Sequence, residues 1–302
     1  MATNIVEIFG YSPSDMSEAA KSARRNFHCP FIDRRCQKSL RDGSPSGVCT
    51  LKPVTTAPVI CCPYRLYGDK YQILTQTAQR AFGSKVRLFS GQEALIAENE
   101  PGYRRVAVFG KGWGKELRLP NRGASGGYFV DWILALLTET GDLEEFIAIE
   151  VQSIDTTGNY QDERNAALDE QNFSGRSTAG FNWENVNKRI LPQLIYKGHA
   201  LRQEPLCKKG LFFISPKPVY DKIKERLGGD LRKYAYQPGS LTFDWYDLDD
   251  VIEKGNPRAL NFINSFTTTV DQVALAFTAP SNLPDAGVYE QAIRNVLEAP
   301  IA

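Results

Sequence analysis

Three residues of this 302-residue chain combine side-chain types and a spacing that can do chemistry, namely Asp131, Glu150 and Gln152. Two carboxylates and one amide at a single sheet edge place several oxygens around one point, and a divalent cation binds well between carboxylate oxygens. The competing interpretation is that Asp131 and Glu150 are ordinary surface residues of an exposed hairpin. Their spacing alone does not decide between the two.

The element that must position these residues is a β-hairpin. Two apolar runs, Val130 to Leu137 and Phe146 to Val151, flank the polar stretch 138–142, whose glycine and aspartate are typical of tight turns. Asp131 and Glu150 are equally distant from such a turn and therefore face each other. Side chains alternate along a strand, so the amide two positions after Glu150 lies on the same face as that carboxylate.

The order of the elements around the hairpin predicts a mixed α/β fold. The patterns indicate a helix over Asp69 to Phe82, strands near 86–89, 106–109 and 116–119, a helix over Asn182 to Tyr196 ended by Gly198, a strand at Leu211 to Ile214, a helix over Pro216 to Leu227, and a mostly helical tail from Ala259. Pro192 is expected to kink or shorten the second helix. This order fits a mixed sheet flanked by helices.

Length and composition set the outer bounds. The length allows one large domain or a main domain with an appendage, and 42% hydrophobic with 24% charged residues is ordinary for a soluble globular protein. A formal net charge of +1 is not that of a protein that coats nucleic acid nonspecifically. With no signal peptide and no apolar run of membrane-spanning length, we expect a cytoplasmic protein without a membrane partner.

One local run is basic and contains a single acid, Glu204. Its members are Lys188, Arg189, Lys197, Arg202, Lys208 and Lys209. One interpretation of the run is a solvated face. The other is that the helix carrying part of it packs across the sheet and brings Lys188 and Arg189 near the carboxylates.

Five of the six cysteines fall in one N-terminal segment that is rich in proline and poor in helical periodicity: Cys29, Cys36, Cys49, Cys61 and Cys62. In a cytosolic chain such clustering favours a metal site over disulfides, and four thiolates suit tetrahedral zinc or a single iron. Cys61 and Cys62 point to opposite sides of an extended chain, so only one of them is expected to bind. The alternative is free cysteines packed as small hydrophobes, as we expect for Cys207.

These segments resemble restriction endonucleases of the NotI type, with similarity to their EagI-like members. The most distinctive block is Ile-Glu-Val-Gln-Ser-Ile-Asp at 149–155, which the residues 157–160 extend. Further similarity covers most of the chain, in the segments 29–31, 47–49, 59–67, 182–193, 208–211, Pro284 and 294–296.

The resemblance implies a nuclease core over residues 69–302, of the kind built on an Asp followed by Glu-x-Lys, with Gln in place of Lys. Asp131, Glu150 and Gln152 match these three positions. With the Val151 carbonyl, the two carboxylates would bind Mg²⁺, which activates a water for hydrolysis of a DNA phosphodiester. A neutral Gln152 cannot supply the positive charge of a lysine, so we expect it to position the attacking water by hydrogen bonding.

The resemblance also implies that residues 1–68 wrap the core and hold a structural iron, or zinc, between four cysteines. Cys29, Cys36, Cys49 and Cys62 match best, and Cys62 is favoured over the extra Cys61 because proline follows it.

Members of this family act as homodimers on palindromic, GC-rich double-stranded DNA, so the resemblance implies these partners, a GGCC-like core in the site and a cognate DNA methyltransferase. Guanine is most often read by arginine, and the candidates are Arg118, Arg122, Arg176 and Arg202. Two other functions stay open. One is a catalytically degenerate, metal-stapled DNA-binding protein, which the missing motif lysine favours, and the other is a structure-specific repair nuclease of the same fold.

Overall fold

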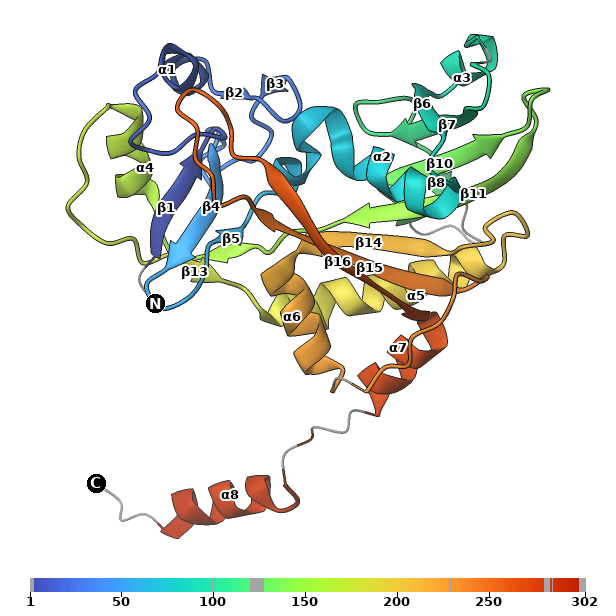
Figure 1. Ribbon diagram of the computed structural model, residues 1–302. Coiled ribbons are helices and arrows are strands. Elements are labelled where there is room, and N and C mark those ends of the chain that lie inside the picture. Colours follow the sequence, from blue (N-terminus) through green and yellow to red (C-terminus); the bar gives the residue numbers. More distant parts are fainter. Residues whose placement is uncertain are drawn as a thin grey trace.

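The computed structural model of the protein describes residues 3–98, 100–119, 128–228, 230–279, 283 and 285–298. Its centre is a seven-stranded sheet, in the order β16-β15-β14-β11-β10-β7-β6 (Figure 1). The strands of this sheet are β6 (Val86–Ser90), β7 (Arg104–Gly110), β10 (Trp132–Leu137), β11 (Leu143–Val151), β14 (Leu211–Pro216), β15 (Ser240–Leu248) and β16 (Leu260–Thr269). The pairs β6/β7, β11/β14 and β14/β15 are parallel and the others antiparallel, so the sheet is mixed.

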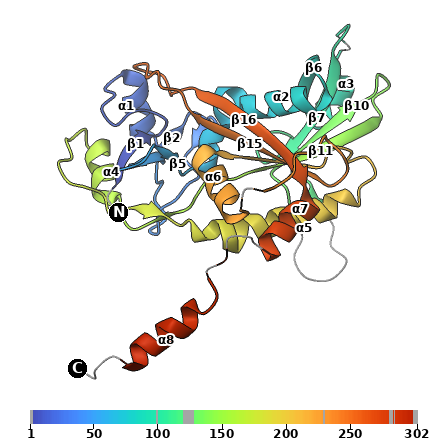
Figure 2. The same ribbon diagram turned by 60° about the horizontal axis from the view of Figure 1, so that its bottom comes forward.

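Helices cover both faces of this sheet. One face carries α2 (Gly68–Phe82), and the other carries α5 (Leu191–Arg202), α6 (Lys217–Arg226) and α7 (Val270–Thr278) (Figures 1 and 2). The prediction of a mixed sheet flanked by helices is therefore confirmed. α2 ends where expected, because Gly83 adopts φ 103°, a left-handed conformation that ends a helix at little strain.

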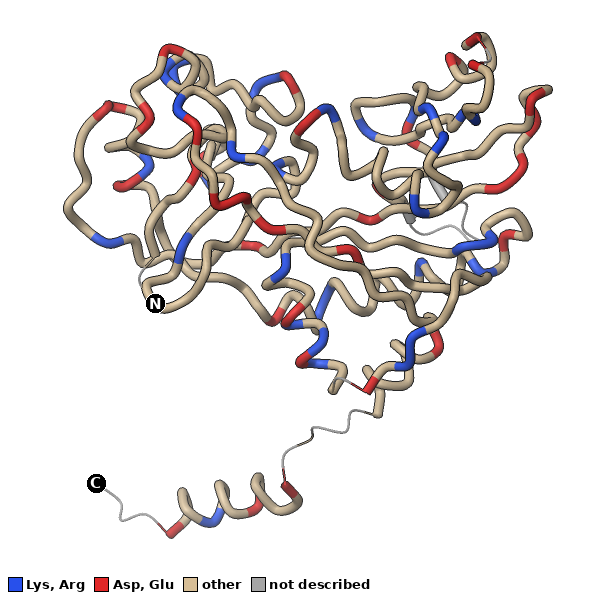
Figure 3. The backbone as a smooth tube through the Cα atoms, in the orientation of Figure 1, with Lys and Arg blue, Asp and Glu red and all other residues tan. Residues whose placement is uncertain are grey.

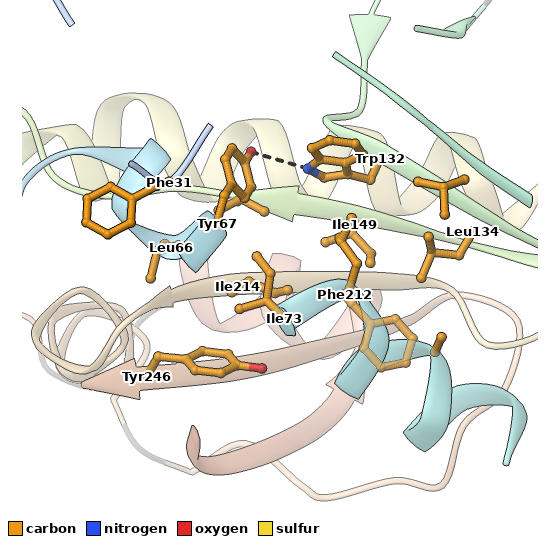
Figure 4. Close-up of a cluster of buried hydrophobic side chains, with 14 of the residues drawn as sticks. Phe31, Leu66, Tyr67, Ile73, Trp132, Leu134, Ile149, Phe212, Ile214 and Tyr246 are labelled. Atoms are coloured by element: carbon orange, nitrogen blue, oxygen red, sulfur yellow. Dashed lines mark hydrogen bonds between the residues drawn. The ribbon is translucent and has the colours of Figure 1, made fainter. Parts of the chain in front are cut away.

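The face under α2 holds a large apolar cluster. Alternate residues of the central strands, Trp132, Leu134, Ile149 and Phe212 among them, pack there against Ile73 of α2 (Figure 4). The indole Nε1 of Trp132 donates a hydrogen bond to the hydroxyl of Tyr67 at 3.2 Å. Because successive side chains of a strand point to opposite faces, residues 131 and 150, which neighbour Trp132 and Ile149, face α5 instead.

The N-terminal part forms its own small sheet, in the order β1-β4-β5. Its strands are β1 (Thr3–Ile8), β4 (Val48–Pro53) and β5 (Val59–Ile60), and α1 (Glu18–Arg25) and α4 (Gln161–Leu168) lie beside it. A buried ion pair joins this sheet to the segment leading into α2, with Arg65 Nε 3.0 Å from Glu7 Oε2 and both side chains 1% exposed. The N-terminal part thus has a buried apolar cluster, to which Tyr160, Ala167 and Ala179 also belong.

Short elements connect these units. They are β2 (His28–Cys29), β3 (Arg34–Arg35), η1 (Pro63–Tyr67), α3 (Glu93–Ile96), β8 (Arg118–Leu119), β9 (Tyr128–Phe129), β12 (Thr156–Thr157), β13 (Gly180–Phe181) and η2 (Val186–Ile190). The last helix, α8 (Val288–Glu298), has no buried residue and stands apart from the rest of the chain in both ribbon views (Figures 1 and 2). None of the described helices is long and apolar enough to cross a membrane.

Two predictions about elements are wrong. The tail is not mostly helical, because β16 (Leu260–Thr269) pairs along its whole length with β15 at the edge of the main sheet. Gly198 does not end the second helix, which continues to Arg202. Gly198 is instead a contact point, since a Cβ there would lie 2.8 Å from Cγ2 of Val270, at the start of α7.

Candidate active site

The predicted hairpin is present, with the predicted register. Trp132 pairs with Ile149 across β10 and β11, so Asp131 lies opposite Glu150 at the open end of the hairpin. At the closed end the backbone N–H of Thr138 donates to the carbonyl of Asp142, and Gly141 adopts φ 91°. A glycine is needed at that point because other residues adopt this conformation only with strain.

Asp131 is fixed by the backbone of the opposite strand. Its Oδ2 accepts a hydrogen bond from the N–H of Val151 at 2.8 Å. Burial raises the pKa of the Asp131 carboxyl, and the charge of Glu116 raises it further. The Val151 hydrogen bond and the charge of Lys197 act in the opposite direction. This carboxylate is therefore oriented while its charge is only partly compensated.

Glu150 is the most perturbed group of the site. Its Oε1 lies 2.6 Å from Nζ of Lys197, and its Oε2 is buried without a hydrogen-bond partner among the described residues. Burial, followed by the charge of Asp131, raises the pKa of Glu150 to about 7, although Lys197 and, to a smaller extent, the backbone N–H of Asp131 lower it. A buried carboxylate oxygen without a partner is costly unless something occupies it, so Oε2 is the atom of this site that a further positive group would stabilise.

Lys197 is the residue beside the carboxylates that the sequence alone did not place there. Its side chain is 7% exposed and reaches Glu150 from α5, the helix that packs across this face of the sheet. A signal was present: the apolar stripe of this helix includes Ile190, Leu194 and Leu201, and Lys197 falls on the same stripe at helical spacing. A lysine within a buried stripe requires a buried anion as its partner.

Pro192 lies where the hydrogen bonding of the predicted helix changes. The turn before the proline is a π-helix, η2 (Val186–Ile190), and Pro192 then lies in the first turn of α5. The proline does not shorten the helix, which continues to Arg202.

Gln152 lies on the same side as Glu150, as predicted. The two side chains line one narrow space together with Ile190 and Leu194 from the helix face. Nε2 of Gln152 donates to the backbone carbonyl of the next residue, Ser153, at 3.2 Å. The amide thus contributes no charge, and the positive group beside the carboxylates comes from α5.

Asp131 and Glu150 are the residues of this site that could hold a divalent cation, although no third His, Cys, Asp or Glu of the described chain joins them in a geometry that can hold a metal ion. Asp131 and Glu150 present carboxylate oxygens from opposite strands, and the unpartnered Oε2 of Glu150 is the atom that a cation would satisfy. Oxygen ligands of this kind suit a hard cation such as Mg²⁺. A bound cation of this type lowers the pKa of a coordinated water and stabilises negative charge on a phosphate.

The four matched cysteines lie near one another. In every pair formed from Cys29, Cys36, Cys49 and Cys62, the charge of one thiolate raises the pKa of another. Burial is the larger cause and raises the pKa of Cys29 to about 11 and that of Cys62 to about 12. As the described side chains lie, however, no group of three or more His, Cys, Asp or Glu residues has a geometry that can hold a metal ion.

Cys61 points to the other side, as alternation along an extended chain predicts. Its Sγ lies 3.4 Å from Nζ of Lys38 and packs in the apolar core of the N-terminal sheet. The Lys38 ammonium also donates to the backbone carbonyl of Cys61 at 2.8 Å. Of the two adjacent cysteines, Cys62 is therefore the one grouped with the other three thiols.

The basic run is largely paired with acids rather than forming one patch. Lys188 lies 3.7 Å from Glu184, and the other pairs are Arg189 with Asp155, Arg202 with Asp271 and Lys209 with Glu145. Figure 3 shows basic and acidic positions interspersed along the chain. The expectation that Lys188 and Arg189 reach the carboxylates is wrong, because the residue that does so is Lys197.

Three of the four candidate guanine readers lie within the described chain. Arg118 begins β8, Arg176 is exposed, and Arg202 is bound to Asp271 at 2.7 Å. Arg122 lies outside the described residues.

Comparison with known protein families and with curated protein sequences returned no match for this chain.

Proposed function

We propose that this chain is a Mg²⁺-dependent endonuclease of the type II restriction class. The observation that carries the proposal is the pair of carboxylates at the open end of the hairpin, where the buried Oε2 of Glu150 has no hydrogen-bond partner among the described residues. A buried carboxylate beside a second, partly buried one is unfavourable by itself and becomes favourable when a cation binds between them. The sequence block that contains Glu150 and Gln152 independently resembles such enzymes.

The proposed reaction is hydrolysis of a DNA phosphodiester. The oxygen of a water forms a bond to phosphorus, the bond from phosphorus to the leaving oxygen breaks, and one proton of the water ends on that leaving oxygen. Asp131 and Glu150 hold the cation, with the Val151 carbonyl as a further oxygen. Gln152, on the same face, orients the water through its amide.

The proposed substrate is a palindromic, GC-rich site in double-stranded DNA with a GGCC-like core. The proposal includes a homodimer, because a two-fold protein reads a two-fold site with identical surfaces. A methyltransferase that protects the same sequence belongs to such a system. These elements rest on the sequence resemblance.

The test uses the full chain, Mg²⁺ and unmethylated DNA that contains many GC-rich palindromes. Discrete fragments are expected, and Glu150→Ala should abolish them. Glu145→Ala is the matched control, since Glu145 is also buried on β11 and also paired with a lysine at 2.6 Å but lies near the closed end of the hairpin. No cleavage by the wild type would refute the proposal.

A second candidate is a DNA-binding protein without nuclease activity. The neutral Gln152, hydrogen-bonded to the backbone carbonyl of Ser153 just after β11, is the observation that favours it. The same experiment separates the two, because tight binding of double-stranded DNA without cleavage in Mg²⁺ supports this candidate. Cleavage confined to flaps or nicks would instead indicate a repair nuclease of the same fold.

We further propose that Cys29, Cys36, Cys49 and Cys62 hold a structural iron or zinc. The mutual influence of the four thiols supports this, and their placement does not by itself complete a coordination sphere. Metal analysis of the purified protein tests the proposal. Cys49→Ser should lose the ion, whereas Cys61→Ser, whose thiol points to the other side, should keep it.

A further inference from the structure

The positive charge that a lysine would supply at position 152 is present in the structure, but it comes from another element. Gln152 is neutral, and the lysine nearest to the carboxylates is Lys197, whose Nζ is 2.6 Å from Oε1 of Glu150. Its charge acts on both acids, since it lowers the pKa of Asp131 as well as that of Glu150. It therefore faces the same point as the two carboxylates.

Lys197 is held firmly in this position. It lies within α5 between the buried residues Leu194 and Leu201, and its neighbour Gly198 packs closely against Val270. A lysine 7% exposed has few alternative rotamers that keep its ammonium solvated or paired. The ammonium is thus a fixed feature of the site rather than a flexible surface group.

The two oxygens of Glu150 have different surroundings. Oε1 is bound to Lys197, whereas Oε2 is buried and has no partner among the described residues. A divalent cation can therefore bind at Oε2 without displacing Lys197 from Oε1. The ammonium and the metal ion are compatible in one site because they use different atoms of the same carboxylate.

We propose that Lys197 supplies, from helix α5, the positive charge that Gln152 cannot provide, and that it stays bound to Oε1 of Glu150 during the reaction. This inference rests on the proposed nuclease function. A fixed ammonium beside the metal-binding carboxylate stabilises the additional negative charge that develops on the phosphate, and preorganised charges of this kind contribute factors of about 10²–10⁴ in rate.

The alternative role for Lys197 is that of a counterion in the metal-free protein, which Mg²⁺ makes unnecessary. The two roles predict different results for Lys197→Met. If Lys197 takes part in the reaction, kcat at saturating Mg²⁺ and DNA falls by about 100-fold or more, with KM for DNA changed less than about threefold. If it is only a counterion, kcat under these conditions stays within about threefold of the wild type and only the thermal stability falls.

Two further measurements complete the test. Calorimetric titration of the DNA-free protein with Mg²⁺ should show binding by Lys197→Met at least as tight as that by the wild type, because a like charge has been removed. Adding Gln152→Lys to Lys197→Met should restore kcat at least tenfold, because residue 152 lies on the same face as Glu150 and can return an ammonium to it. Lys209→Met is the matched control, since Lys209 binds Glu145 on the same strand at the same distance, and its kcat should not change.

The outcomes separate the two proposals. A wild-type chain that cuts no DNA refutes the proposed function whatever the variants do. A wild-type chain that cuts, combined with a Lys197→Met variant of nearly normal kcat or a double variant that regains nothing, overturns the role of Lys197 alone.

Discussion

Glu150 should destabilise the metal-free protein at neutral pH, and removing its charge should stabilise the fold. Its pKa rises from the usual 4.5 to about 7 because the carboxyl is buried beside Asp131. Between these two pH values the folded protein holds more protons on Glu150 than the unfolded chain does. Stability therefore falls as the pH rises through this range, and the loss is complete above pH 7.

The magnitude follows from the two pKa values. A difference of one pH unit corresponds to about 1.36 kcal/mol, so ionisation of Glu150 lowers the free energy of unfolding by about 3 kcal/mol at pH 8 and by less than about 1 kcal/mol at pH 5. Glu150→Gln keeps the shape of the side chain and an oxygen for Lys197 but removes the charge, and Asp131 remains as the anion whose charge interacts with that lysine. We expect it to raise the melting temperature of the metal-free protein by about 5 °C at pH 8.

The assay is thermal unfolding in EDTA, followed by calorimetry or circular dichroism at pH 5 and pH 8. Glu145→Gln is the control, because Glu145 is buried on the same strand and paired with Lys209 at 2.6 Å but lies far along the hairpin from Asp131. It should not stabilise the protein at either pH. The reasoning is refuted if Glu150→Gln melts at or below the wild-type temperature at pH 8, or if its stabilisation does not shrink at pH 5.

Three further predictions follow from the same structure. Mg²⁺ should raise the melting temperature of the wild type at pH 8 but not that of the double variant Asp131→Asn/Glu150→Gln, because a ligand stabilises only the protein that binds it. An equal rise in both proteins would show that the ion binds elsewhere. Arg65→Met should lower the free energy of unfolding by about 3–5 kcal/mol in urea titrations, since it leaves Glu7 buried without its partner, and a loss below about 1 kcal/mol would contradict this. A chain ending at residue 279 should melt within about 1 °C of the full chain, because α8 has no buried residue, and a large drop would show that this helix packs against the body.

Local sequence patterns were sufficient to predict the hairpin and its pairing. The apolar runs, the glycine of the turn and the equal spacing of Asp131 and Glu150 are short-range features, and alternation alone placed Gln152 on the face of Glu150. The end of α2 at Gly83 and the opposite directions of Cys61 and Cys62 were predictable for the same reason. In each case the information lies within a few residues of the feature.

The edge strand had a local signal that the prediction of a helical tail overlooked. Leu260–Thr269 contains two phenylalanines, one isoleucine and three threonines, residue types that favour strands, and β15 supplies the edge with which it pairs. Gly198 continues a helix instead of ending it, because Val270 occupies the space that a side chain would need.

By itself, the sequence determined which residues carry the carboxylates and that they meet at one end of a hairpin, because strand geometry fixes this locally. Only the tertiary structure decided which positive group joins them. Lys197 lies 47 residues from Glu150 along the chain, and the packing of α5 across the sheet brings its ammonium to 2.6 Å from the carboxylate. The same burial raises the pKa of Glu150 and leaves Oε2 without a hydrogen-bond partner among the described residues, since removal from water is a property of the assembled layers.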